Sequence, residues 1–126
     1  FQGLGETVVN TNTKLGLKIS VEAAPWIPVE EVRIFRNGTL IQTLPILSSK
    51  ILGHVNRFNK TINLEGIDAD SYFTVEAGVK ITATGAPVNP ALLATVQTIE
   101  DGVVPLGYTN PIFVDRDGGG YVPPGL

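Results

Sequence analysis

The sequence predicts an all-β chain, an antiparallel immunoglobulin-like β-sandwich of about seven short strands that forms one domain over residues 1–126. Several runs alternate apolar and polar residues with a period of two, which is the pattern of a strand with one buried face. The 14 Gly and 9 Pro residues interrupt these runs every few positions. An Asn-Gly pair between two of the runs is the strongest short-range signal of a β-hairpin.

The first half of the chain contains three predicted strands. In the run 15–21, every second residue is apolar: Leu15, Leu17, Ile19 and Val21. The runs 32–36 and 39–44 are separated only by Asn37-Gly38, two residues that tolerate the positive φ values of a two-residue turn. We therefore predict one strand at 15–21 and a hairpin formed by the two runs that follow.

Between these units, Trp26 lies in a segment with Pro25 and Pro28. Prolines spaced three apart are excluded from a helix interior and from a central strand, so this segment is predicted to be a bend. The simplest interpretation of Trp26 is that it closes one end of the core while its indole N–H finds a carbonyl oxygen. The alternative is an exposed platform for a ligand.

The second half of the chain contains the remaining predicted strands. The run 57–64 places Phe58, Lys60, Ile62 and Leu64 on one face and Arg57, Asn59, Thr61 and Asn63 on the other. Lys60 is the exception on the apolar face, and its long side chain can reach solvent. A strand at 71–77 is predicted to continue through 79–83 past a bulge at Gly78, and a last strand is predicted at 112–114.

The stretch around 90–97 allows two interpretations. Asn89 and Pro90 resemble a helix cap and a first-turn proline, so a short helix is one of them. The β-branched residues from position 95 onward favour an irregular loop instead.

Composition excludes several functional classes. With no Cys and no Met, the chain has no disulfide, no thiolate metal site and no cysteine nucleophile, and the single His rules out His-rich metal clusters. A net charge of −3 with 9 Lys and Arg residues is unlike a protein that binds nucleic acid. No apolar run approaches the roughly 20 residues that a membrane helix needs, so no membrane insertion is expected.

The sequence indicates no catalytic residues and no cofactor-binding residues, so we expect that the chain is not an enzyme. His54 lies in a predicted loop, with no spacing rule that joins it to a nucleophile. Carboxylate pairs occur at Glu30-Glu31, beside a strand start, and at Asp68/Asp70, in a turn. Neither pair has a recognisable partner in the sequence.

Asp115 and Asp117 are the candidate metal ligands, and calcium is the candidate ion. They match positions one and three of an EF-hand loop, with Gly120 at the sharp-turn position six. Gly119 offers no side chain at position five, and Leu126 replaces the bidentate Glu at position twelve. The motif therefore predicts at most about millimolar calcium affinity. The alternative is a glycine-rich turn in which both aspartates bind their own backbone.

Five segments in order resemble the C-terminal region of bacterial PHP-type metallohydrolases of the CehA/McbA kind. The second segment carries A-P-W-I-P-V, and the third is the hairpin V-R-I-F-R-N-G. The fourth is Y-F-T-V-E-A, and the fifth is Y-T-N-P-I-F-V-D. They lie at positions 3–8, 19–29, 32–38, 72–77 and 108–115. The match spans nearly the whole chain.

This resemblance implies a non-catalytic accessory domain appended to a metal-dependent hydrolase, often in an exported protein. In that family the metal-binding and catalytic residues lie upstream in a His- and Asp-rich domain, so none maps onto this chain. The implied partners are a covalently linked hydrolase domain or neighbouring subunits, and the implied location is extracellular or the cell envelope. Five aromatic residues are then expected to lie chiefly in the core: Trp26, Phe35, Phe58, Phe73 and Phe113. The segment 109–112 is expected to anchor the last strand.

A second hypothesis is a secreted structural or adhesive module that assembles through sheet edges. The weakly charged, apolar ends 1–10 and 121–126 motivate it, because such ends can add a strand to a neighbouring sheet.

Overall fold

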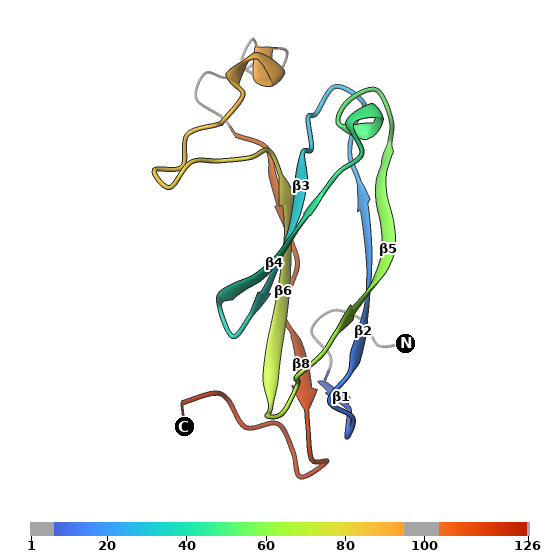
Figure 1. Cartoon of the computed structure of the whole chain (residues 1–126), viewed down its shortest axis with the longest axis vertical. Helices are drawn as coiled ribbons and strands as arrows, with labels where there is room; N and C mark the ends of the chain where they lie inside the picture. Colours follow the sequence, from blue (N-terminus) through green and yellow to red (C-terminus); the bar gives the residue numbers. More distant parts are fainter. Residues whose placement is uncertain (1–6, 95–103, 126) are drawn as a thin grey trace.

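The structure, a computed structural model that describes residues 7–94 and 104–125, consists of two β-sheets that face each other (Figure 1). The described strands are β1 (Thr7–Val9), β2 (Leu15–Glu22), β3 (Glu31–Arg36), β4 (Thr39–Pro45), β5 (Asn56–Leu64), β6 (Ser71–Gly78), β7 (Leu106–Tyr108) and β8 (Ile112–Asp115). The described residues also include two short 3-10 helices, η1 (Ser48–Lys50) and η2 (Pro90–Leu93). The predicted all-β sandwich is confirmed. Among the described residues, no helix has the length and apolar character that a membrane crossing requires.

The strands divide unevenly between the sheets. The larger sheet has the order β1-β8-β6-β3-β4, with β7 also pairing with β6, and the smaller sheet is the antiparallel pair β2-β5. Of the strand pairs that the structure describes, β1 and β8 run parallel and the others are antiparallel. Immunoglobulin-like sandwiches divide their strands in the same way, with strands B and E in one sheet and strands C, F and G in the other.

The hairpin between β3 and β4 forms as predicted. Asn37 and Gly38 adopt φ values of 51° and 81°, which are the positive values that a two-residue turn of this kind requires. The Asn37 side chain also accepts a hydrogen bond of 3.0 Å from the Tyr72 N–H, so the turn is attached to β6.

Strands β7 and β8 together form one interrupted strand along β6. Leu106–Tyr108 pairs with the end of β6, and residues 112–114 of β8 pair with its beginning. Between them, the Thr109 N–H donates to the Val75 carbonyl oxygen (3.0 Å), and the Val75 N–H donates to Thr109 Oγ1 (3.1 Å). The segment 109–112 therefore anchors the last strand, as expected.

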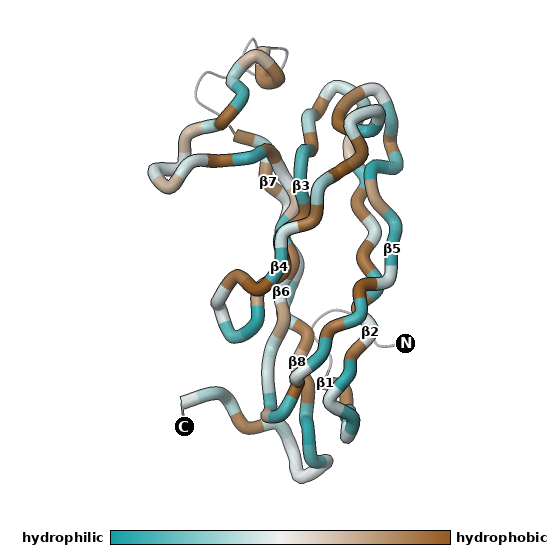
Figure 2. Tube along the Cα trace, in the orientation of Figure 1, coloured by the Kyte–Doolittle hydropathy of each residue, from teal (hydrophilic) through white to brown (hydrophobic). Residues whose placement is uncertain are grey.

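The core lies between the two sheets, and hydrophobic positions recur along the strands of both sheets (Figure 2). Leu17 and Ile19 of β2 face Phe73 and Val75 of β6, and the alternation predicted for both strands is observed. The buried apolar cluster comprises Leu17, Ile19, Val29, Val32, Ile34, Ile46, Phe58, Leu64, Ile67, Phe73, Val75 and Val114. Of the aromatic residues expected there, Phe58 and Phe73 are buried, whereas Phe35 and Phe113 are only half-buried.

Strand β5 departs from its predicted pattern at its beginning. Arg57, expected on the polar face, is buried, with 1% of its surface exposed. The register shifts here, because Val21 pairs with Phe58 while Glu22 pairs with Asn56, which leaves Arg57 as the extra residue of a bulge. A bulge re-aims a side chain, and strict alternation does not anticipate it. Lys60 is exposed as expected, with its Nζ 5.6 Å from the Phe58 ring centre.

The predicted continuation of β6 through 79–83 is wrong. The strand ends at Gly78, and beyond it Ile81 forms only an isolated bridge with Pro87. A Cβ atom on Gly78 would lie 2.7 Å from the Pro105 carbonyl oxygen, so a close backbone approach explains the glycine. At 90–97, the described part is the 3-10 helix η2, while 95–97 lie outside the described residues.

Candidate functional site

Three carboxylates gather at the end of the sandwich where β8 terminates. Asp115 is the last residue of β8, Asp117 lies in the following turn, and Asp70 precedes β6. One oxygen atom from each side chain lies within 4.8 Å of the others. The two residues selected from the sequence are therefore joined by a third from a distant part of the chain, which could complete a set of oxygen ligands for calcium.

Asp115 is held in place by the backbone that follows it. Its side chain is only 3% exposed, and its two oxygens accept hydrogen bonds of 2.8 Å from the N–H groups of Gly118 and Gly120. Burial favours the neutral acid, but these hydrogen bonds outweigh it, and the pKa of Asp115 lies below its usual value. Gly118 and Gly120 adopt φ values of 77° and 102°, so the turn requires glycine at both positions.

The other two carboxylates are also bound to backbone groups. The exposed Asp117 accepts a 2.8 Å hydrogen bond from the Gly119 N–H. Asp70 accepts hydrogen bonds from the N–H groups of Arg116 (2.8 Å) and Val122 (2.7 Å). The geometry thus contains the glycine-rich turn that was the alternative to calcium. The same oxygens have further lone pairs that a cation could use, so calcium at Asp115 and Asp117 stays a prediction.

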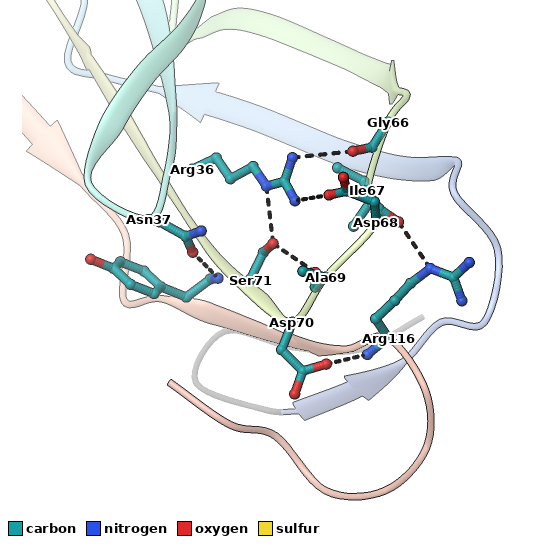
Figure 3. Close-up of polar contacts among 10 residues, drawn as sticks. Arg36, Asn37, Gly66, Ile67, Asp68, Ala69, Asp70, Ser71 and Arg116 are labelled. Carbon is teal, nitrogen blue, oxygen red and sulfur yellow. Dashed lines mark hydrogen bonds and ion pairs between the residues drawn. The ribbon is translucent and has the colours of Figure 1, made fainter. Parts of the chain in front are cut away.

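Two arginines fix the turn that carries Asp70 (Figure 3). Arg36 Nη2 lies 3.2 Å from an Asp68 oxygen, and its Nε donates to Ser71 Oγ at 2.9 Å. Arg116 Nε donates to the Ile67 carbonyl oxygen at 2.9 Å. Hydrogen bonding to Arg36, together with its charge, holds the pKa of Asp68 below its usual value. The turn that carries Asp70 is therefore held by side chains from β3 and from the segment after β8.

The remaining titratable residues singled out in the sequence lie apart from this cluster. His54 is exposed in the loop before β5. This loop and the 116–120 turn lie at opposite ends of the sandwich (Figure 1). Glu30 accepts a 2.8 Å hydrogen bond from the Lys80 N–H. Glu31 forms an ion pair of 2.7 Å with the largely buried Arg33. In the described part of the chain, these groups do not form a nucleophile–base arrangement with His54.

Trp26 does not close the core, which corrects the first interpretation of this residue. Its side chain is 55% exposed, in the bend between β2 and β3. Nearby hydrogen bonds join this bend to the β4–β5 loop, from the Gly53 N–H to the Pro25 carbonyl (2.8 Å) and from the Ala23 N–H to the Val55 carbonyl (3.0 Å). These hydrogen bonds hold the bend between Pro25 and Pro28 against the β4–β5 loop, and Trp26 lies outside the two sheets.

Other apolar side chains are exposed on the same two loops. Leu47, Leu52 and Val55 of the β4–β5 loop are all exposed, as is Trp26 of the facing bend. We call these four residues the apolar end. Large apolar side chains that gather at the surface on neighbouring loops are typical of an interaction surface.

Comparison of the chain with protein-family models, with curated proteins and with solved structures found no match. The resemblance to PHP-type metallohydrolases accordingly rests on the sequence segments quoted above.

Proposed function

We propose that this chain is a non-catalytic β-sandwich accessory domain that packs against a metal-dependent hydrolase domain, as the resemblance to CehA/McbA-type enzymes implies. The observation that carries the proposal is the apolar end. Trp26, 55% exposed, is the kind of large aromatic residue that anchors protein interfaces. In this proposal the hydrolytic chemistry belongs to the partner domain.

The apolar end is suited to an interface because it is held in shape before a partner binds. Arg57 Nη1 and Nη2 donate to the carbonyl oxygens of Ile51 (2.7 Å) and Ala24 (2.6 Å), and its Nε donates to that of His54. One buried side chain thus joins both loops. A preorganised surface loses less conformational entropy on binding than a mobile one, which favours association.

An activity assay tests the catalytic half of the proposal. The purified chain, incubated with phosphate esters and added divalent metal, is expected to give no turnover above the buffer rate. His54→Ala serves as the matched variant. Turnover by the wild-type chain that disappears in His54→Ala would overturn the proposal.

A docking experiment tests the other half. In a covalent fusion to a CehA/McbA-type catalytic domain, amide exchange in the loops 24–27 and 52–55 should slow relative to the isolated chain. Trp26→Ser should reverse that protection, because it removes the anchor. Tyr108→Ser, which alters an exposed aromatic residue of β7, is the control and should leave protection intact. Equal exchange in the fusion and the isolated chain would contradict docking through the apolar end.

A second candidate function, assembly through sheet edges, is favoured by β4. This strand borders the larger sheet in the described part of the chain, and it exposes Leu40 and Ile41. Long apolar edges pair with other chains. The two ends named in the sequence contribute differently: residues 1–6 lie outside the described residues, and Tyr121 packs against Phe113 with ring centres 4.9 Å apart. Residue 121 is therefore bound to its own sheet.

Sedimentation velocity at several concentrations tests this second function. Self-association should increase with concentration and should weaken in Leu40→Lys, because a charged edge residue opposes strand pairing. Thr43→Lys, at another exposed position of β4, separates the effect of charge from the loss of the apolar side chain. A monomeric wild-type chain at every concentration would exclude assembly through edges.

A further inference from the structure

A small pocket is formed by residues from the end of β4, from η1 and the loop before it, and from the first half of β5. We call it the basic pocket, and its lining residues are Pro45, Leu47, Lys50, Asn56, Arg57, Phe58, Asn59 and Lys60. Its volume is about 240 Å³. Pockets for drug-sized ligands occupy about 300–1,000 Å³, so this one has the size for one or two side chains. It adjoins the apolar end, because Leu47 belongs to both.

Three positively charged residues line the basic pocket. Lys50 is half-buried, Lys60 is exposed, and Arg57 is buried. Within residues 7–94 and 104–125, none of the three forms an ion pair, and no Asp or Glu lines the pocket. Glu22 pairs with Asn56 across the β2–β5 register but is not a lining residue. Because the whole chain has a net charge of −3, the pocket is a local reversal of its charge.

Lys60 occupies a position of β5 that alternation assigns to the core. It has the parity of Phe58 and Leu64, which are buried, and it pairs with the buried Ile19 of β2. Its ammonium group lies over the Phe58 ring, 5.6 Å from the ring centre, where the aromatic face attracts a cation. The charge of Lys60 is therefore held beside the apolar wall of the pocket.

The rest of the lining combines apolar and hydrogen-bonding groups. Pro45, Leu47 and Phe58 supply apolar surface. The exposed Asn56 and Asn59 supply side-chain amides, which can donate to a carboxylate. Lysine ammonium groups bind carboxylates as point charges. The lining is therefore complementary to a ligand that presents a carboxylate beside a small apolar group.

We propose that the basic pocket binds an acidic segment of a protein partner, in which a carboxylate side chain is adjacent to an apolar side chain of about the size of leucine. The apolar side chain packs against Leu47 and Phe58, and the carboxylate pairs with Lys60. The buried charge of Arg57 adds to the attraction, because a buried charge is screened less than an exposed one. Since the pocket adjoins the apolar end, the segment belongs to the partner domain of the proposed function, and only this assignment rests on that function.

Titration of the full chain with capped peptides tests the recognition directly. The probes are S-E-L-E-S, S-Q-L-Q-S and S-E-S-E-S, and the readout is the NMR amide shifts of Asn59 and Lys60. We expect S-E-L-E-S to bind with a dissociation constant of about 1 mM. The other two should bind at least about tenfold more weakly, because each lacks the charged or the apolar part of the ligand. Equal binding of the three peptides, or no saturation by S-E-L-E-S below about 10 mM, would overturn the proposal.

Two further conditions identify the nature of the contact. Raising NaCl from about 0.05 M to about 0.5 M should weaken the binding of S-E-L-E-S, because salt screens exposed charges. Inorganic phosphate at matched ionic strength should not displace the peptide, since phosphate cannot use the apolar wall. Binding that is insensitive to salt would refute the role of the lysines. Displacement by phosphate would identify a site for small anions and would reject the peptide segment as its occupant.

Substitutions of the lysines test the residues themselves. Lys60→Gln should weaken binding of S-E-L-E-S by about tenfold, and Lys80→Gln, at an exposed position after β6, is the matched control and should not. The double variant Lys50→Glu with Lys60→Glu should prefer S-K-L-K-S over S-E-L-E-S, a reversal that a purely structural role of these residues does not produce. Unchanged affinity in Lys60→Gln would reject the site.

The fusion to a CehA/McbA-type catalytic domain separates this proposal from docking through the apolar end. If S-E-L-E-S does not bind while the loops 24–27 and 52–55 are protected in the fusion, the basic pocket is rejected and the docking stands. If the peptide binds as expected while these loops exchange equally in the fusion and in the isolated chain, the pocket stands and its assignment to the linked domain is rejected.

Discussion

Replacement of Arg57 is the perturbation that the structure predicts most sharply. Only 1% of the surface of Arg57 is exposed, and its guanidinium donates to the backbone carbonyl oxygens of Ala24, Ile51 and His54. Among the described residues, no ion pair includes it. Burial alone lowers the pKa of the Arg57 guanidinium from its usual value. The two loops of the apolar end are therefore joined by one charged fork that binds only carbonyl oxygens.

The size of the effect follows from opposing terms. A hydrogen bond from a charged donor contributes about 1.5–3 kcal/mol, so three such bonds are substantial. Burial of the guanidinium charge costs several kcal/mol, and a variant without the charge does not carry this cost. We expect Arg57→Met to lose about 2–4 kcal/mol of unfolding free energy, after the partial rehydration of the released carbonyls. Arg57→Lys keeps the charge but lacks the planar fork, so its loss should be at least as large.

Urea unfolding measures this prediction, with amide exchange as a local readout. The Gly53 N–H, which donates to the Pro25 carbonyl, should lose protection in both variants before the β2–β5 ladder does. A loss below about 0.5 kcal/mol in Arg57→Met would refute the role assigned to the three hydrogen bonds. A smaller loss in Arg57→Lys than in Arg57→Met would show that charge, and not the geometry of the fork, stabilises the loops.

Three further outcomes follow from the same structure. Trp26→Ser should change the unfolding free energy by less than about 0.5 kcal/mol in urea, because the indole is exposed, and a loss above 2 kcal/mol would restore the core interpretation. If calcium binds Asp115 and Asp117 with a dissociation constant of about 1 mM, then 10 mM calcium should stabilise the chain by about 1.4 kcal/mol. Melting midpoints that are equal in calcium and in chelator would reject that site, and Asp117→Asn should abolish any shift. The lowered pKa of Asp115 stabilises the fold above the unfolded pKa of about 3.9, and this contribution is lost as pH falls through the lower folded value. Asp115→Asn should therefore flatten the loss of stability below about pH 4 in acid titration, and an unchanged acid limb would contradict this.

Several elements could be predicted because their signals are local. The alternation from Leu15 to Val21 reflects the period of two of any strand with one buried face, and Asn37-Gly38 supplies the φ values of its turn within two residues. The three-residue strands β1 and β7 have no such signal. They are strands because β8 and β6 offer free hydrogen-bonding groups beside them.

The candidate site divides in the same way. Asp115 and Asp117 were recognisable from their spacing to the glycines, since those contacts span at most five residues. Asp70 was assigned only to a turn, because its partners Arg116 and Val122 are 46 and 52 residues away in the chain. Only residue-to-residue pairing across the sheet places it beside the other two carboxylates.

The sequence by itself determined that this chain is an all-β sandwich, because period-two alternation and turn-forming residues act over a few neighbouring positions. Tertiary structure decided which side chains are buried at the margins of that sandwich. A bulge turned Arg57 inward, and the bend between two prolines left Trp26 outside. Both outcomes depend on contacts between loops that are far apart in the sequence. The free energy of these contacts is a sum over residues that no short stretch of sequence contains.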